Sequence, residues 1–237
     1  PCVVTMREVN KYLITPHTAD QKISYSERWN PTGIRVQYFV SHSWRGQFHE
    51  LVESLRKEGV AAELLRFPDR TSATGQEIDA YLRKEKELSD KAVHELFSRN
   101  RWEKAAEMRT LLAGGTTLVV DRYAHSGVAF SAAKGVPGMD AEWCRAPDAG
   151  LPAPDVLFLL EISPEAAAAR GGFGEERYET SNFQRAVAEQ FLRLKDASWR
   201  VVDAARPVEA VHAEISALAA AQVERCRAGG VPLRDLW

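Results

Sequence analysis

The sequence predicts an α/β fold, a three-layer sandwich built on a five-stranded parallel sheet, and two observations carry this prediction. Short apolar, β-branched runs alternate with amphipathic segments from about Ile34 onward, which is the pattern of successive βαβ units. The chain has 237 residues, 45% of them apolar, which is enough for one sizeable core. We therefore expect one principal domain.

The expected elements follow one another in order along the chain. Five apolar runs are predicted as strands: Arg35–Val40, Val60–Phe67, Thr116–Val120, Asp155–Leu160 and Trp199–Val202. Four helices are predicted between or after them: Phe48–Lys57, Ser89–Met108 with Ser89 as its cap, a helix opened by a Ser181 and Gln184 capping box, and a last one near Val208–Arg225. This order predicts parallel crossover connections.

A boundary is expected near Gly33. The residues before it show no clean period, and Asn30-Pro31-Thr32-Gly33 has the composition of a turn. We predict an N-terminal extension over 1–33 and an α/β domain over 34–237, in which 34–59 supplies the first strand and helix.

Charge and cysteine content narrow the function classes. A formal charge of −2 gives no global basic field, so a sequence-independent nucleic-acid binder is disfavoured. The three separated cysteines, Cys2, Cys144 and Cys226, favour neither a disulfide framework nor a zinc cluster. No apolar run approaches the roughly 18 residues that a membrane helix needs. We expect a soluble protein without nucleic-acid or membrane partners in a reducing compartment: the cytoplasm, with the nucleus and mitochondrion as alternatives.

Charged pairs follow two of the predicted strands. Asp69-Arg70 comes after the second strand, and Asp121-Arg122 after the third. Ligands of open parallel sheets bind at the carboxyl ends of the strands, and Arg beside Asp suits a phosphate with water or magnesium. Either dipeptide alone is explained equally well by a structural ion pair. Because the pairing occurs twice, the pattern favours an anion site.

Two further segments carry candidate chemistry. Phe97 and Arg101 are four residues apart on one helix face, an arrangement that suits a flat heterocycle, although core packing and a solvated arginine are the plainer alternatives. The stretch Arg170–Tyr178 is rich in glycine and charge, which is typical of a mobile lid over a phosphate site or of an ordinary surface loop. Arg170 and Arg177 are the candidate arginines of this lid.

Longer strings of the sequence resemble eukaryotic thymidylate kinase. They are Glu63-Leu-Leu-Arg-Phe-Pro-Asp-Arg70, Leu96-Phe-Ser-Arg-Asn-Arg-Trp-Glu103, Thr117-Leu-Val-Val-Asp-Arg-Tyr-Ala124 and Ser126-Gly-Val-Ala-Phe130, and the match continues to Leu236-Trp237. The resemblance implies a P-loop-kinase-like fold and a nucleotide-binding transferase that uses ATP to phosphorylate thymidine monophosphate (dTMP) to the diphosphate (dTDP) in dTTP biosynthesis. It also implies magnesium as cofactor and a possible homodimer.

The resemblance implies roles for single residues as well. Phe97 would stack on thymine, and Arg101 would hydrogen-bond its carbonyl edge. Arg70 and Arg122 would hold the acceptor phosphate as catalytic residues, and catalytic Asp121 would sit behind magnesium through a water molecule. The remaining expected substrate contacts are Asp69, Gly127, Phe130 and Tyr178.

The sequence does not contain the phosphate-binding loop of that family. Such a loop reads G-x-x-x-x-G-K-[ST], because backbone N–H groups and one Lys must surround the donor phosphates. Ser43, Trp44 and Arg45 occupy the places of its Gly, Lys and hydroxyl residue. The sequence therefore predicts an impaired donor site. Two alternatives stay open, a catalytically dead nucleotide-binding pseudo-kinase and a protein-interaction module in Pro1–Gly59 that uses the rest as scaffold.

Overall fold

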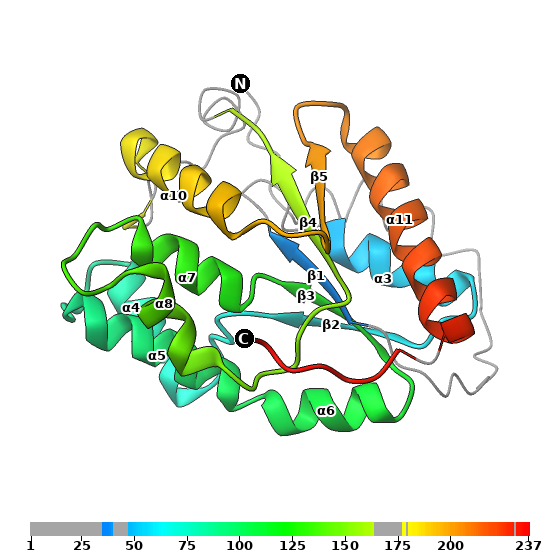
Figure 1. Ribbon diagram of the computed structural model, residues 1–237, viewed down its shortest axis with the longest axis horizontal. Coiled ribbons are helices and arrows are strands. Elements are labelled where there is room, and N and C mark those ends of the chain that lie inside the picture. The colour runs from blue at the N-terminus through cyan, green and yellow to red at the C-terminus, as the bar shows by residue number, and fades with distance from the viewer. Residues whose placement is uncertain (1–34, 40–46, 164–176, 179, 230) are drawn as a thin grey trace.

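The computed structural model describes residues 35–39, 47–163, 177–178, 180–229 and 231–237 (Figure 1). Its strands are β1 (Arg35–Phe39), β2 (Ala62–Arg66), β3 (Thr117–Asp121), β4 (Val156–Glu161) and β5 (Trp199–Asp203). Its helices are α3 (Gln47–Lys57), α4 (Ala73–Leu82), α5 (Asp90–Trp102), α6 (Ala105–Ala113), α7 (Ala124–Ala132), α8 (Ala141–Arg145), the 3₁₀ turn η3 (Ala146–Asp148), α10 (Ser181–Leu194) and α11 (Val208–Gly229).

The five described strands form one parallel sheet in the order β2-β3-β1-β4-β5. The first and last residues of each strand differ by at most two positions from those of the apolar run predicted from the sequence. The chain continues from β3 into α7 on one face of the sheet, whereas α3, which follows β1, packs on the opposite face. In open α/β sheets, such a reversal places the ligand crevice beyond the carboxyl ends of the two strands.

Alternate side chains of β4 pack against opposite helical layers. Val156, Phe158 and Leu160 lie in one cluster with α3 and α11, and Leu157 and Leu159 lie in another with α7 and α10. Figure 1 shows the sheet between these two layers. Because each of these side chains is buried, each stabilises the fold by roughly 1.5–3 kcal/mol.

The half of the sheet made by β2 and β3 is covered by α6 and by the C-terminal segment, residues 231–237. Met108 and Leu112 of α6 pack with Leu118 of β3, and Leu236 joins the same cluster. The N–H of Leu236 donates to the carbonyl oxygen of Leu151 over 2.8 Å. The end of the described chain is thus fixed beside the segment that follows η3.

The long helix predicted over Ser89–Met108 is wrong, because the structure has two helices there. Ser89 is the predicted cap and accepts from the N–H of Ala92, but α5 ends at Trp102 and α6 begins at Ala105. The N–H of Lys104 donates to Arg101 three residues back, which tightens the last turn and ends the α-helical ladder. The apolar pattern continues through this break, so the pattern alone did not reveal it.

The capping box at Ser181 is a second correction. Thr180 is the N-cap, Ser181 is already the first helical residue, and Thr180 makes no side-chain capping bond. The side-chain amide of Gln184 donates to the carbonyl oxygen of Tyr178 instead. The helix is therefore tied to the segment before it. Helices α4, α7 and α8 were not predicted.

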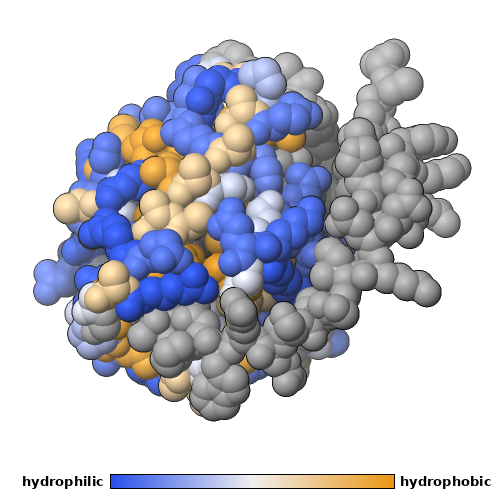
Figure 2. Space-filling model, turned by 90° about the vertical axis from the view of Figure 1, so that its right-hand side faces the viewer, coloured by the Kyte–Doolittle hydropathy of each residue, from blue (hydrophilic) through white to orange (hydrophobic). Residues whose placement is uncertain are grey.

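Figure 2 views the molecule from the side of α11, where hydrophilic side chains predominate and apolar ones gather in small groups among them. None of the helices in the described part of the chain is long and apolar enough to cross a bilayer.

The boundary expected at Gly33 and the segment with Ser43, Trp44 and Arg45 lie outside the described residues, as does Arg170.

Candidate active site

The candidate site is built by α5, by α7, by η3, by the turns that follow β2 and β3, and by the segment just before α10. Its central charge is Arg101, which is only 2% exposed. Nε of Arg101 donates to Oδ1 of Asp148 over 3.0 Å, and Nη2 donates to Oδ2 over 2.6 Å. Asp148 is fully buried in η3. A bidentate pair of this kind holds the guanidinium plane in one orientation, and its other N–H groups are not bonded to Asp148.

Gly127 of α7 makes room for this guanidinium. A Cβ atom at position 127 would lie 2.9 Å from Nη2 of Arg101 and 3.2 Å from Nη1. Because Asp148 fixes Arg101, the guanidinium cannot simply swing aside. The approach of α7 to α5 therefore depends on the absence of a side chain at this position.

Aromatic rings line the neighbouring surface. The ring of Phe130 lies 5.8 Å from that of Tyr178, and Phe97 packs with Tyr178 against the cluster that contains Tyr81. The Tyr178 hydroxyl donates to that of Tyr81 over 3.2 Å. Burial raises the pKa of each phenol to about 12, so both are protonated at neutral pH. We call Phe97, Phe130 and Tyr178 the aromatic wall: Phe130 contacts Tyr178, and Phe97 packs on the same cluster as Tyr178.

Arg122 and Asp121 lie at the carboxyl end of β3. Arg122 has a φ of 62°, a left-handed conformation that is strained for a residue with a Cβ and that often marks functional sites. Its guanidinium lies over the ring of Phe130, 5.3 Å from the centroid. Asp121 is 4% exposed, and its Oδ2 lies 3.2 Å from Nε of Arg66. The contact with Phe130 thus directs Arg122 toward the aromatic wall.

The turn after β2 carries Asp69 and Arg70. Nη1 of Arg70 lies 2.5 Å from Oδ1 of Asp79 on α4, so this arginine pairs with a carboxylate from another element. Oδ1 of Asp69 accepts from the N–H and the hydroxyl of Thr71, which lowers the pKa of the Asp69 carboxyl. The turn is therefore closed by its own side chains.

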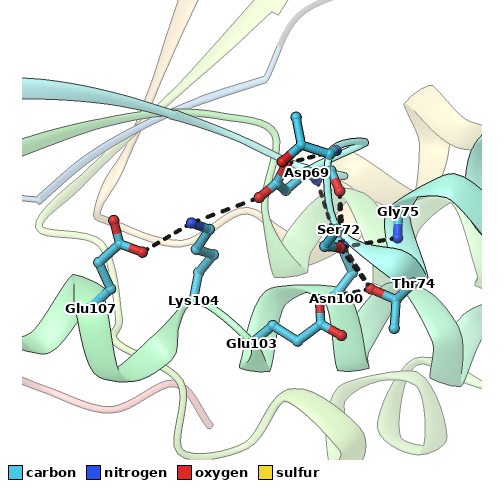
Figure 3. Close-up of polar contacts among 9 residues, drawn as sticks. Asp69, Ser72, Thr74, Gly75, Asn100, Glu103, Lys104 and Glu107 are labelled. Atoms are coloured by element: carbon cyan, nitrogen blue, oxygen red, sulfur yellow. Dashed lines mark hydrogen bonds and ion pairs between the residues drawn. The ribbon is translucent and has the colours of Figure 1, made fainter.

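Asn100 of α5 joins this turn to the helix that carries Phe97 and Arg101 (Figure 3). Its Oδ1 accepts from the N–H of Asp69 over 2.8 Å, and its Nδ2 lies 2.9 Å from the hydroxyl of Thr74. A Cβ at position 75 would fall 1.7 Å from the carbonyl oxygen of Asp69, so Gly75 is what allows α4 to begin this close.

Arg177, predicted in the lid, packs on α4. Its guanidinium lies 4.3 Å from the centroid of the Tyr81 ring, and its Nη2 donates to Glu87 over 2.6 Å. Nε donates to the carbonyl oxygen of Tyr81. In this structure Arg177 ties the segment before α10 to α4.

His94 joins α5 to α7 and α8 behind the site. Nε2 lies 3.0 Å from the carbonyl oxygen of Cys144, which can only accept, so Nε2 carries the proton. Nδ1 therefore accepts from the Ser131 hydroxyl over 2.7 Å. Burial lowers the pKa of His94 to about 4, so the ring is neutral at physiological pH.

Two residues at the centre of this arrangement were missed as site residues from the sequence, namely Asp148 and Asn100. Asp148 lies 47 positions from its partner Arg101, so no local pattern connects them. Asn100 stands beside Arg101 in the sequence, but the sequence does not show which groups an amide in a helix will bond. Only the tertiary fold brings these partners together.

A parallel sheet of this order, with arginines and a buried carboxylate beyond its carboxyl ends, defines an open α/β protein with a candidate anion site at the topological switch point. Comparisons with known proteins narrow this class. A family model described as thymidylate kinase matches residues 46–215. The chain is 49% identical to a thymidylate kinase of Danio rerio over 194 residues, which is 81% of this chain and 90% of the relative. This chain belongs to the thymidylate kinase family.

Further relatives agree with this assignment. The chain is 49% identical to a thymidylate kinase of Arabidopsis thaliana over 191 residues, which cover 81% of this chain and 71% of that protein. The human thymidylate kinase is 44% identical over 194 residues, which cover 81% and 90%. The solved thymidylate kinase of Candida albicans superimposes with a TM-score of 0.74 at 27% identity, covering 87% of this chain and 99% of that one. The fold is therefore that of P-loop kinases, and the family is one of nucleotide-binding transferases.

Proposed function

We propose that this chain binds dTMP at the site built on α5 and α7 and transfers the γ-phosphate of ATP to it, giving dTDP and ADP. The observation that carries this proposal is the buried Arg101–Asp148 pair opposite Gly127, which holds a planar set of donors beside an aromatic wall. Phe97 stacks on the thymine ring, and the N–H groups of Arg101 that Asp148 leaves over bind its carbonyl edge. Tyr178 and Phe130 enclose the nucleoside.

The acceptor phosphate lies between Arg70 and Arg122 in this proposal. Arg70 is paired with Asp79, and Arg122 rests on Phe130, so both guanidinium groups have defined places before the substrate arrives. When the phosphate binds, Arg70 shares its N–H groups between Asp79 and a phosphate oxygen. Placement of charge in advance is what phosphoryl transfer chiefly requires.

Magnesium fits the carboxyl end of β3. Asp121 is a buried carboxylate there, and magnesium usually keeps several waters and takes few protein ligands, so contact through water suits a single carboxylate. When bound, the ion supplies neutralisation of the charge that develops on the phosphates.

We further propose that the donor site is impaired. No stretch of the sequence reads Gly-Lys-Ser or Gly-Lys-Thr, and the family match begins at residue 46, after Ser43, Trp44 and Arg45. Loss of one preorganised donor typically lowers kcat by about 10²–10³. The same observation favours a second candidate function, a pseudo-kinase that binds dTMP without transferring phosphate.

A coupled assay with ATP, magnesium and dTMP tests the proposed donor site. We expect turnover at least about 100-fold below the ordinary kinase range of roughly 1–100 s⁻¹. The same assay with Arg122→Ala separates residual transfer from background, because the loss of a phosphate-binding arginine abolishes genuine turnover. Turnover within the ordinary range would overturn the claim of an impaired donor site and leave the acceptor site untouched.

A further inference from the structure

Asn100 occupies the contact between the two halves of the proposed acceptor site. It lies in the last turn of α5, one residue before Arg101, and its side chain is fully buried. Figure 3 shows the side chain directed from α5 into the turn that leads from Asp69 to α4. The proposed thymine-binding helix and phosphate-binding turn are therefore joined through this amide.

The side chain pairs with both polar groups of the Asp69 backbone. Oδ1 accepts from the N–H of Asp69 over 2.8 Å, while Nδ2 lies 3.2 Å from the carbonyl oxygen of Asp69. Nδ2 also lies 3.0 Å from the hydroxyl of Ser72 and 2.9 Å from that of Thr74. Only a group that donates and accepts at once can make this set of contacts, and a carboxylate or an apolar side chain cannot.

The segment that Asn100 holds carries the proposed phosphate ligand and its partner. Arg70 follows Asp69 directly, and its guanidinium pairs with Asp79 of α4. Ser72 caps α4 by accepting from the N–H of Gly75 over 3.1 Å. Asn100 thus contacts the residue before Arg70 and the cap of the helix that carries Asp79, so both ends of the Arg70–Asp79 pair are placed relative to α5.

Two outer contacts support the same junction. The Thr74 hydroxyl donates to Oε2 of Glu103 over 2.8 Å, and Nζ of Lys104 lies 3.8 Å from Oδ2 of Asp69. These side chains are more exposed than Asn100, and a partly exposed ion pair such as Lys104–Asp69 contributes little. The buried amide is therefore the principal connection.

We propose that Asn100 is a positioning residue that sets Arg70 at a fixed distance from the thymine site, so that one molecule of dTMP meets Arg101 at its base and Arg70 at its phosphate together. This inference rests on the proposed acceptor site. It makes a specific demand: loss of Asn100 harms binding of the phosphate and spares binding of the nucleoside.

Calorimetric titration of the full chain with dTMP and, separately, with thymidine tests this demand. Asn100→Ala is expected to weaken dTMP binding at least about tenfold and thymidine binding less than about threefold, because only dTMP engages Arg70. In an Arg70→Ala background, Asn100→Ala should add less than about a further twofold, since a positioning residue has no effect once its target is gone. Glu95→Ala, an exposed change on the same helix, is the matched control and should leave both affinities unchanged.

Several outcomes would overturn the inference. Equal losses for dTMP and thymidine would make Asn100 a general structural residue, and effects of Asn100→Ala and Arg70→Ala that multiply would show that it acts independently of Arg70. If Asn100→Ala does not fold, Thr74→Val decides the matter: this variant keeps the shape of a half-buried side chain and removes one partner of the amide. It should weaken dTMP alone, and an unchanged affinity for dTMP would contradict the inference. A wild type that binds neither ligand would overturn the proposed function itself.

Discussion

The charged guanidinium of Arg101 is buried and forms an ion pair with Asp148. A buried ion pair contributes little net stability, but removing one partner is costly, about 3–5 kcal/mol, because the other charge is left buried without compensation. The pair with Asp148 is therefore better understood as a means of orientation. It holds the guanidinium rigidly in one orientation, and the absence of a side chain at Gly127 leaves room for that guanidinium beside α7.

Gly127→Ala should consequently impair the site more than the fold. The added methyl would lie 2.9 Å from Nη2 of Arg101, closer than real Cβ contacts, so the guanidinium or α7 must shift. We expect dTMP affinity to fall at least about tenfold. The free energy of unfolding should fall by at most about 3 kcal/mol. Titration and chemical denaturation measure the two quantities.

Gly229→Ala at the end of α11 is the control, because a Cβ there would meet nothing within 4 Å. It should leave both quantities nearly unchanged. Loss of stability without loss of affinity in Gly127→Ala would refute a steric role for Gly127 in the site.

Helices α5, α7 and α8 form the scaffold behind these residues, and His94 links all three. Its ring accepts from Ser131 of α7 and donates to Cys144 of α8. The ring must be neutral for Nδ1 to accept a hydrogen bond. Burial keeps it neutral by lowering the His94 pKa from 6.5 to about 4. The scaffold therefore depends on pH.

We predict that folding stability falls as the pH drops below 6.5. The unfolded chain takes up a proton on His94 near pH 6.5, whereas the folded chain does so only near pH 4, so protonation favours unfolding in this window. Each such histidine contributes a loss of up to about 1.4 kcal/mol per pH unit. His125, whose pKa burial also lowers to about 4, adds to the slope.

Denaturant titrations at pH 7 and pH 5 measure this effect. His94→Gln removes one titrating group, so the stability of this variant should decline less steeply between pH 7 and pH 5 than that of the wild type. The part of the decline that His125 contributes should remain. An identical decline in the two proteins would show that His94 does not carry the predicted linkage.

The molecule as a whole shows which features a sequence can reveal. Alternation of apolar runs predicted all five described strands because period and composition are local properties, and the spacing of Phe97 and Arg101 predicted one helix face. The break at Lys104 was not predictable from that pattern, because it follows from a single tightened turn. Asp148 and Asn100 were not recognised, since their partners are chosen by packing of distant segments.

The same contrast applies to the site. Residues named through family resemblance lie on α5, on α7, at the two strand ends and, for Tyr178, just before α10, and the structure brings Phe130 against Tyr178 and Arg122. The structure adds the partners that fix them, among them Asp79 for Arg70. The proposed acceptor site is therefore a product of several elements held together, and a test of it must change its centre without unfolding the whole.

Titration of dTMP into the wild type and into the double variant Arg101→Gln/Asp148→Asn is that test. The double variant removes both charges of the buried pair at once, so no unpaired buried charge remains. Arg99→Ala, an exposed change on the same helix, is the control. We predict binding by the wild type and the control, and a loss of at least about tenfold in the folded double variant. Equal affinity in all three proteins would contradict the assignment of Arg101 to the thymine site.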